Sequence, residues 1–166
     1  MFKIDDYIVY GMTGVCKVVD IANESFIGKE KRKYYILSPV YNDTTVIKTP
    51  VENNKITIRK IISEDEVKSL INDSPNLNSL WIEDEKARNN QFKAILKRGK
   101  CDELITLIRS IYSNKGYTES IGKKVHKVDS DIMKEAERLI NEEFAVVLNI
   151  SPDEVRSYIE RAVDKQ

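Results

Sequence analysis

The sequence has few of the side chains on which catalytic and metal sites most often depend. Among its 166 residues it has one histidine, His126, and two cysteines, Cys16 and Cys101. These are too few and too far apart for a zinc-binding cluster, and the serines have only His126 as a possible general base. Each cysteine lies in an apolar-periodic stretch, which favours a small core residue. We therefore expect no catalytic residues, no bound metal and no cofactor.

Two other patterns associated with chemistry are incomplete. The stretch GYTESIGKK, residues 116–124, places Lys124 where a phosphate loop needs Ser or Thr, and no strand visibly precedes it. Glu142 and Glu143 are neighbours on an expected helix, so their side chains point about 100° apart and do not share a proton. We expect this pair to form a solvated face, and His126, in its lysine-rich loop, to be solvent-exposed. An enzyme is thus a weak hypothesis.

The sequence also lacks long hydrophobic runs. No run approaches 18 apolar residues, and the N-terminal stretch MFKIDDYIVYG is acidic and short. It has neither the pattern of a membrane-spanning helix nor the apolar region of a signal peptide. We expect a cytoplasmic protein that does not bind membranes.

The net charge of zero conceals strong local differences. Residues 63–85 have one basic and seven acidic side chains, whereas residues 86–127 have 11 basic and three acidic ones. A local basic region attracts an anionic partner even when the whole chain is neutral. Charge alone slightly favours a simpler interpretation, in which these regions are solvated helix faces.

The first 62 residues have the pattern of a small β domain. Short runs of β-branched and aromatic residues alternate with turn signals such as NDT after Tyr41 and ENN after Val51. Five short strands at this spacing predict a small antiparallel barrel or a strongly bent sheet. Pro50 should lie at a strand end or a sheet edge, because it has no backbone N–H to donate. The expected strands cover residues 7–11, 14–22, 33–41, 44–51 and 55–62.

From residue 63 onward the period is helical and predicts an all-α domain. Ser63 and Ser151 each stand three residues before a glutamate, which is the pattern of a capping box at a helix start. Gly99 is expected to end a long helix, and residues 116–128 are expected to form a loop. The predicted fold is therefore α+β, with a β domain at 1–62 and a helical domain at 63–166. The expected helices cover residues 63–72, 78–98 and 102–115, then run from a cap at Asp129 or Ser130 to Leu148, and from Ser151 onward.

The order of these features resembles a known family. The β domain reads MFKIDDYIVYGMTGVCKVVDI and, further on, KRKYYILSPVYNDTTVIKTPVENNKITIRKII. In the helical domain the lone Trp81 begins a helix that stops at KRGK, and LITLIRSIY and KEAERLINEEFAVVL follow. Over almost the whole chain, this pattern resembles the CarD family of bacterial transcription regulators. The resemblance implies a Tudor-like β module, shared with the RNA-polymerase-interacting domain of transcription-repair coupling factors, and a DNA-contacting helical module.

For the β domain, the resemblance implies binding to the lobe of the polymerase β subunit by addition to an exposed strand. The implied polymerase contacts are Lys48, which matches an often basic position, and its strand neighbours Val46, Ile47, Thr49 and Pro50. Glu24 departs from the family, because some members have a basic residue there. A simpler role for Lys48 is to blunt a sheet edge.

For the helical domain, the resemblance implies that Trp81 inserts into the minor groove at the upstream edge of the transcription bubble and stabilises the open complex. Basic side chains would contact phosphates without reading the sequence. The acidic residues 83–85 depart from the family, and we expect them to face inward or away from DNA. Alternatively, Trp81 is a core anchor packed against its apolar neighbours. The implied DNA contacts besides Trp81 are Arg88, Lys93, Lys97, Arg98, Lys100, Lys123, Lys124 and Lys127.

The expected protein is thus a non-enzymatic, monomeric regulator that RNA polymerase brings to the nucleoid, with promoter DNA as its second partner. The alternative function class is a protein-interaction adaptor, in which the helical domain binds another protein and no DNA.

Overall fold

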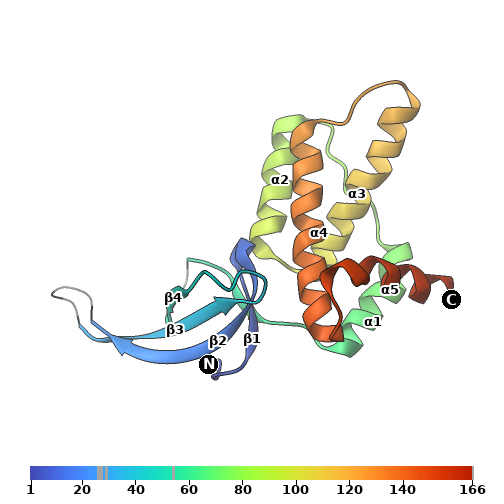
Figure 1. The fold of residues 1–166 in the computed structure, drawn as a ribbon. Helices are drawn as coiled ribbons and strands as arrows, with labels where there is room; N and C mark the ends of the chain where they lie inside the picture. The colour runs from blue at the N-terminus through green and yellow to red at the C-terminus, as the bar shows by residue number, and fades with distance from the viewer. Residues whose placement is uncertain (26–27, 29, 54, 166) are drawn as a thin grey trace. The chain divides into compact units, whose positions relative to one another are not determined.

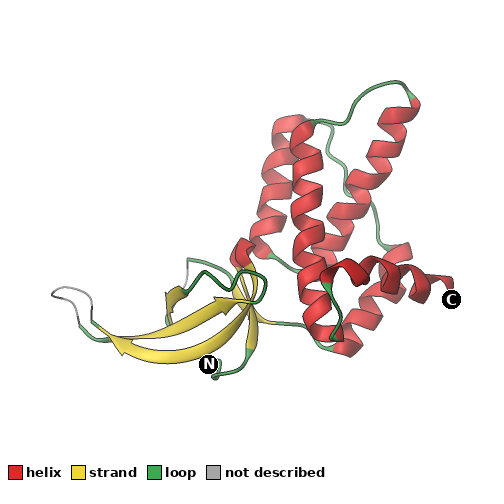
Figure 2. Ribbon diagram, in the orientation of Figure 1, coloured by secondary structure: helices red, strands yellow, loops and turns green. Residues whose placement is uncertain are grey.

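The computed structural model describes residues 1–166 except 26–27, 29, 54 and 166. The chain divides into two compact units, Met1–Ile61 and Ile62–Gln166 (Figure 1). In the described part of the chain, all β-strands belong to the first unit and all α-helices to the second (Figure 2). The fold class is α+β, as the sequence predicts.

The first unit is an antiparallel sheet with the strand order β4-β3-β2-β1-β5. In the described residues its five strands are β1 (Tyr7–Tyr10), β2 (Gly14–Glu24), β3 (Arg32–Pro39), β4 (Ile47–Pro50) and β5 (Ile58–Lys60). The terminal strands β4 and β5 do not pair with each other, so the sheet is open and not a closed barrel. A bulge between Val18 and Asp20 interrupts the β2–β3 pairing, which is a usual way to bend a sheet.

Alternation along the strands builds the core of the sheet. On β2, Cys16 and Val18 are buried, and on β3, Tyr35 and Leu37 are buried, while the residues between them are more exposed. Ile8 of β1 completes this cluster. The expectation that Cys16 is a small core residue is therefore confirmed.

The second unit contains helices α1 (Glu64–Asp73), α2 (Glu85–Arg98), α3 (Cys101–Ser120), α4 (Lys127–Leu148) and α5 (Pro152–Asp164). Both predicted capping boxes are present, with Ser63 and Glu66 at the start of α1, and Ser151 and Glu154 at the start of α5. Gly99 ends α2 in the left-handed conformation, with a φ of 66°, as expected for a glycine at a helix C-terminus.

Three helix boundaries differ from the prediction. The helix expected from residue 78 begins at Glu85, because Asp84 caps it by accepting a 2.8 Å hydrogen bond from Ala87 N–H. The helix expected to stop at residue 115 continues to Ser120 through Gly116. The next helix begins at Lys127, so Asp129 lies in its first turn rather than at its cap.

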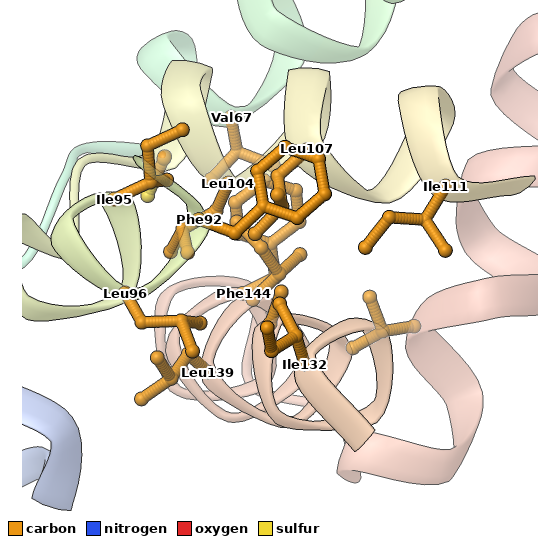
Figure 3. Packing of buried hydrophobic residues seen from close by; sticks show 14 of the residues in the cluster. Val67, Phe92, Ile95, Leu96, Leu104, Leu107, Ile111, Ile132, Leu139 and Phe144 are labelled. Carbon is orange, nitrogen blue, oxygen red and sulfur yellow. The ribbon is translucent and has the colours of Figure 1, made fainter. Parts of the chain in front are cut away.

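Buried apolar side chains from all five described helices form the core of the second unit. Phe92 of α2 and Phe144 of α4 are its largest fully buried members (Figure 3). Leu104, Leu107 and Ile111 supply one face of α3 at the spacing of an amphipathic helix. Cys101 also lies in this core, as its apolar context predicts.

Glu143 does not lie on a solvated face, so this expectation for the Glu142–Glu143 pair is wrong. Its side chain is 2% exposed. The carboxylate accepts hydrogen bonds at 3.1 Å from Ile62 N–H and at 3.1 Å from Cys101 Sγ. A buried carboxylate needs such donors because leaving it unpaired is costly. Glu143 thereby fixes the first residue of the second unit to α3 and α4.

Candidate functional site

Trp81 lies in the irregular segment of residues 77–84 that connects the turn after α1 to α2. The backbone N–H of Leu80 donates a 2.6 Å hydrogen bond to Ser110 Oγ of α3, and Ser110 is buried. The Trp81 ring packs edge-to-face on Phe92, with ring centroids 6.2 Å apart at 63°. Trp81 itself is half-buried. The segment is therefore held against the core while part of the indole ring reaches the surface.

Arg88 of α2 holds the other side of the same segment. Its Nη1 donates hydrogen bonds to the carbonyl oxygens of Ile82, at 2.9 Å, and Glu83, at 3.3 Å. Its guanidinium carbon lies 4.4 Å from the centroid of the Trp81 ring, which is within cation–π range. Its Nε and Nη2 bind the two oxygens of Asp129 on α4 at 3.1 Å and 2.9 Å.

These contacts change the role expected for Arg88. The Arg88 side chain is 3% exposed and that of Asp129 1% exposed, so the ion pair is inside the protein. A guanidinium that is buried and already bonded to a carboxylate and two carbonyls does not reach a DNA phosphate. We therefore remove Arg88 from the expected DNA contacts and regard it as a residue that positions Trp81.

Each of the two alternatives for Trp81 has an observation in its favour, and the wedge itself stays a prediction. Its packing on Phe92 and Arg88 is that of a core anchor, whereas its partial exposure is what a wedge requires. The positioning contacts from Ser110, Arg88 and Asp129 were not predicted from the sequence. Ser110 and Asp129 are far from Trp81 in the chain, and no local pattern reveals that Asp129 faces Arg88.

The acidic residues next to Trp81 have mainly structural contacts. Asp84 caps α2, and Glu85 lies in its first turn, where negative charge stabilises the helix dipole. Glu85 Oε1 also lies 3.7 Å from His126 Nδ1 in an exposed pair. Glu83 is exposed. The side chains of residues 83–85 are all exposed, which excludes the first expected alternative, that they face inward. The second alternative, that they face away from DNA, stays a prediction.

The expected basic DNA contacts separate into two clusters at opposite ends of α2. This helix is about 20 Å long, from 14 residues at about 1.5 Å each. The distal cluster lies at its C-terminal end and consists of Lys97, Arg98 and Lys100. Lys93 lies between the two ends of the helix. The proximal cluster adjoins the start of α4 and consists of Lys123, Lys124 and Lys127. The start of α4 contacts the start of α2 through the pairs His126–Glu85 and Asp129–Arg88 (Figure 1).

All the lysines of both clusters are exposed, as is Arg98. In the distal cluster, Arg98 Nε is paired with Glu103 at 2.9 Å, and this hydrogen bond raises the Arg98 pKa further above its ordinary value. In the proximal cluster, Lys127 Nζ lies 4.0 Å from Asp131. Trp81 contacts Arg88, which lies near the start of α2 and pairs with Asp129 in the first turn of α4. Trp81 is therefore placed toward the end of α2 at which the proximal cluster is found.

In the first unit, the expected polymerase contacts lie on and before the edge strand β4. Thr49 is buried and Ile47 half-buried against the sheet core, whereas Val46 and Lys48 are exposed. Lys48 Nζ pairs with Glu24 Oε1 at 2.7 Å across the sheet face. The residue that departs from the family pattern is therefore the ion-pair partner of Lys48.

The backbone of β4 offers hydrogen-bonding groups at the open edge. Val51 N–H bonds Lys33 O at 3.0 Å, and Thr49 and Ile47 are opposite Tyr35 and Leu37. Along an antiparallel strand, the backbone N–H and C=O groups of successive residues point alternately toward and away from the neighbouring strand. Those of Lys48 therefore point away from β3. Pro50 lies at the next outward position, where its missing N–H costs no ladder bond.

A cleft of about 930 Å³ opens beside this strand. Its basic lining residues are Lys31, Arg32, Lys33, Lys48 and Lys55, against two acidic ones, Glu30 and Glu52. The cleft therefore favours an acidic segment over a basic one.

Two further kinds of site are not found in the described residues. No group of three His, Cys, Asp or Glu side chains there is arranged to hold a metal ion. None of the described helices combines the length and hydropathy needed to cross a membrane.

Comparison with known protein families finds a match for the N-terminal part of the chain. Residues 2–62 match the model of the CarD-like/TRCF RID domain, which covers the first unit from its second residue and ends at the first residue of the second unit. The resemblance predicted from the sequence is confirmed for this region. No curated protein is significantly similar to the chain.

Proposed function

We propose, because the N-terminal unit of this chain is a CarD-like/TRCF RID domain, that the protein is a transcription regulator that binds bacterial RNA polymerase. The domain family is a protein-interaction domain and not a catalytic one. The family match is the observation that carries this proposal. The regulator acts as a monomer in the cytoplasm and reaches the nucleoid through the polymerase.

The edge strand β4 is the proposed polymerase-binding surface. Its outward groups at Lys48 and Pro50 can pair with a strand of the β-subunit lobe, and strand addition obtains its affinity from such backbone hydrogen bonds. The exposed Val46 and Lys48 side chains would add specificity, together with the basic cleft beside them. Ile47 and Thr49 would act by supporting the strand from the core side, where their side chains lie.

The helical unit is the proposed DNA-binding part, with Trp81 as the wedge. An aromatic ring at an opened base step occupies the gap left by unstacking, and stacking is worth about 1–3 kcal/mol. Such an energy would lengthen the lifetime of an open complex by about 5- to 150-fold, with tenfold at about 1.4 kcal/mol. The contacts of Trp81 with Phe92 and Arg88 hold the ring before DNA arrives, which reduces the entropic cost of binding.

Phosphate contacts in this proposal come first from the proximal cluster, Lys123, Lys124 and Lys127, because it lies at the same end of α2 as Trp81. Lys93 and the distal cluster, Lys97, Arg98 and Lys100, would contact DNA only farther along the duplex. Arg88 supports the wedge and does not contact DNA.

A protein-interaction adaptor is the second proposed function. The exposed acidic side chains 83–85 beside Trp81 favour it, since they repel a phosphate backbone. In that case the half-buried ring and its acidic neighbours would contact a basic protein surface.

Trp81→Ala and Lys48→Glu test the two proposed surfaces separately. In a pull-down, Lys48→Glu should reduce binding to RNA polymerase, while Trp81→Ala should bind as the wild type does. In an open-complex lifetime assay, Trp81→Ala should lose the stabilisation of about tenfold, and Trp81→Phe should retain part of it. An unchanged lifetime with Trp81→Ala would exclude the wedge, and polymerase binding without any effect on DNA opening would favour the adaptor.

A further inference from the structure

We infer that Tyr117, near the end of α3, is a second aromatic contact for nucleic acid and stacks on an unpaired base close to the Trp81 wedge. This inference rests on the proposed function and identifies its ligand more closely, as a duplex that is partly melted. It adds a side chain that neither the sequence resemblance nor the family match assigns to a role.

The last two and a half turns of α3 and the residue after it carry large apolar side chains that the protein does not bury. Tyr112 is 69% exposed, Tyr117 64% and Ile121, just after the helix, 49%. From Tyr112 to Lys124, only Asn114 and Thr118 are half-buried. In Figure 1 this end of α3 leans away from α4. Tyr117 and Ile121 are four residues apart and so lie on one side of this helix end, and neighbouring exposed apolar side chains indicate an interaction surface.

The helical register places Tyr117 on the side of α3 that faces the Trp81 segment. At 100° per residue, Tyr117 lies about 20° from Ser110, whereas Tyr112 lies about 160° from it. Ser110 Oγ is the acceptor that holds Leu80 N–H, next to Trp81. Seven residues separate Ser110 from Tyr117, which is about 10 Å along the helix. Tyr117 therefore lies on the side of α3 that faces the Trp81 segment, farther along the helix, and Tyr112 lies on the opposite side.

The charge around Tyr117 favours a polyanion as its partner. Residues 109–128 contain five basic side chains and a single acidic one, Glu119. The proximal cluster belongs to this stretch and is exposed. Aromatic rings among lysines are typical of single-stranded nucleic acid sites, where the bases stack on the rings and the backbone follows the positive charge. A duplex would not expose its bases to Tyr117, so the proposed ligand is the unpaired strand next to the junction.

The two tyrosines give a matched pair of variants for the test. The full-length protein, in complex with RNA polymerase, is titrated with a forked promoter DNA that carries 2-aminopurine at successive unpaired positions. A blunt duplex of the same sequence is the comparison ligand. Tyr117→Ala should weaken binding to the forked DNA about fivefold or more and abolish quenching of one 2-aminopurine near the junction. Tyr117→Phe should retain both, Tyr112→Ala should resemble the wild type, and none of the three should change binding to the duplex.

Three outcomes would overturn the inference. The first is an equal loss with Tyr112→Ala and Tyr117→Ala, and the second is an equal effect of Tyr117→Ala on forked and duplex DNA. The third is weaker binding of Tyr117→Ala to polymerase without DNA, which would make this surface a protein contact. Trp81→Ala separates the inference from the proposed function. If Trp81→Ala loses fork binding and Tyr117→Ala does not, only the inference fails; if neither variant loses it, the proposed DNA role fails as well.

Discussion

Arg88 stacks its guanidinium on Trp81, 4.4 Å from the ring centroid, and at the same time binds both carboxylate oxygens of Asp129. This single side chain therefore joins the irregular segment that carries the tryptophan to α2 and α4. The ring is held by neighbours that are themselves fixed in the core, which is the arrangement expected of a side chain that must present one defined edge to a partner.

Replacing Arg88 should destabilise the helical unit strongly. Arg88→Ala leaves the Asp129 carboxylate buried without its partner and frees the carbonyls of Ile82 and Glu83, and breaking a buried pair costs about 3–5 kcal/mol. Urea unfolding followed by Trp81 fluorescence would measure the free energy, and the native emission should shift to longer wavelength as the ring becomes more exposed. Lys93→Ala, at an exposed position of the same helix, is the control and should change stability by less than about 0.5 kcal/mol.

The double variant Arg88→Met/Asp129→Leu separates the effect of an unpaired buried charge on stability from the effect of Arg88 on the position of Trp81. It removes both charges and should recover much of the stability that Arg88→Ala loses, because no unpaired charge remains. It should not recover open-complex stabilisation, since the contacts to Trp81 and to the segment carbonyls are still missing. Full recovery of both properties would mean that Arg88 has no positioning role.

Local sequence patterns predicted the elements of this fold but not the contacts that position Trp81. Ser63 and Ser151 correctly predicted the starts of their helices, because the whole capping-box pattern lies within four residues of the sequence. The start of α2 was predicted seven residues early, because the apolar residues around Trp81 continue the helical period while Asp84 caps the helix later. A cap of this kind competes with periodicity, and the sequence alone does not show which prevails.

Charge composition identified a basic region of the chain but not which of its basic side chains are exposed. The excess of basic side chains in residues 86–127 includes Arg88, which is buried, together with lysines that are exposed. The same limit applies to Glu143, whose acidic neighbourhood suggested solvent although Ile62 and Cys101 donate to its carboxylate. Long-range pairing decides these positions, and it leaves no local signature.

The proximal basic cluster should contribute more to DNA binding than the distal one. Removing the charges at Lys123, Lys124 and Lys127 should reduce affinity for promoter DNA. It should also lower the slope of log affinity against log salt by up to about 0.9 for each phosphate that the protein no longer neutralises. Removing Lys97, Arg98 and Lys100 alters the net charge equally and is the matched control. A larger slope change for the distal set would place the duplex along the other end of α2.

The backbone of β4 can be tested apart from its side chains. Lys48→Pro removes an N–H that faces the open edge, so the sheet should lose little stability while strand addition loses a hydrogen bond. Lys48→Ala removes only the Glu24 ion pair and the charge. In polymerase pull-downs Lys48→Pro should bind markedly more weakly than Lys48→Ala, with thermal melting as the check on folding. Equal binding by the two variants would exclude Lys48 N–H from the interface.

The neighbours Glu143 and Glu142 should differ in their importance for stability. Glu143→Leu leaves Ile62 N–H and the Cys101 thiol without their common acceptor, and each buried unsatisfied group costs about 1–3 kcal/mol. Glu142→Leu, one position along α4, leaves Arg138 paired with Glu135 and should have a smaller effect. Chemical denaturation of both variants measures the difference, and similar losses would contradict the structural role of Glu143.

Glu142 should make the stability of the helical unit depend on pH. Burial raises the pKa of its carboxyl above the ordinary value, although the nearby Arg138 opposes the rise. An ordinary glutamate ionises at about pH 4, so above this pH the folded state binds more protons than the unfolded chain. The free energy of unfolding contributed by Glu142 therefore decreases as the pH increases from about 4 through the raised pKa of the folded state. Glu142→Gln removes the titration. The difference in unfolding free energy between this variant and the wild type, measured in urea at successive pH values, should therefore move in favour of the variant as the pH rises from about 4. Glu137→Gln, on the same helix, is the control for an added neutral amide. If the difference in unfolding free energy between Glu142→Gln and the wild type did not change with pH, the Glu142 carboxyl would titrate alike in the folded and unfolded states.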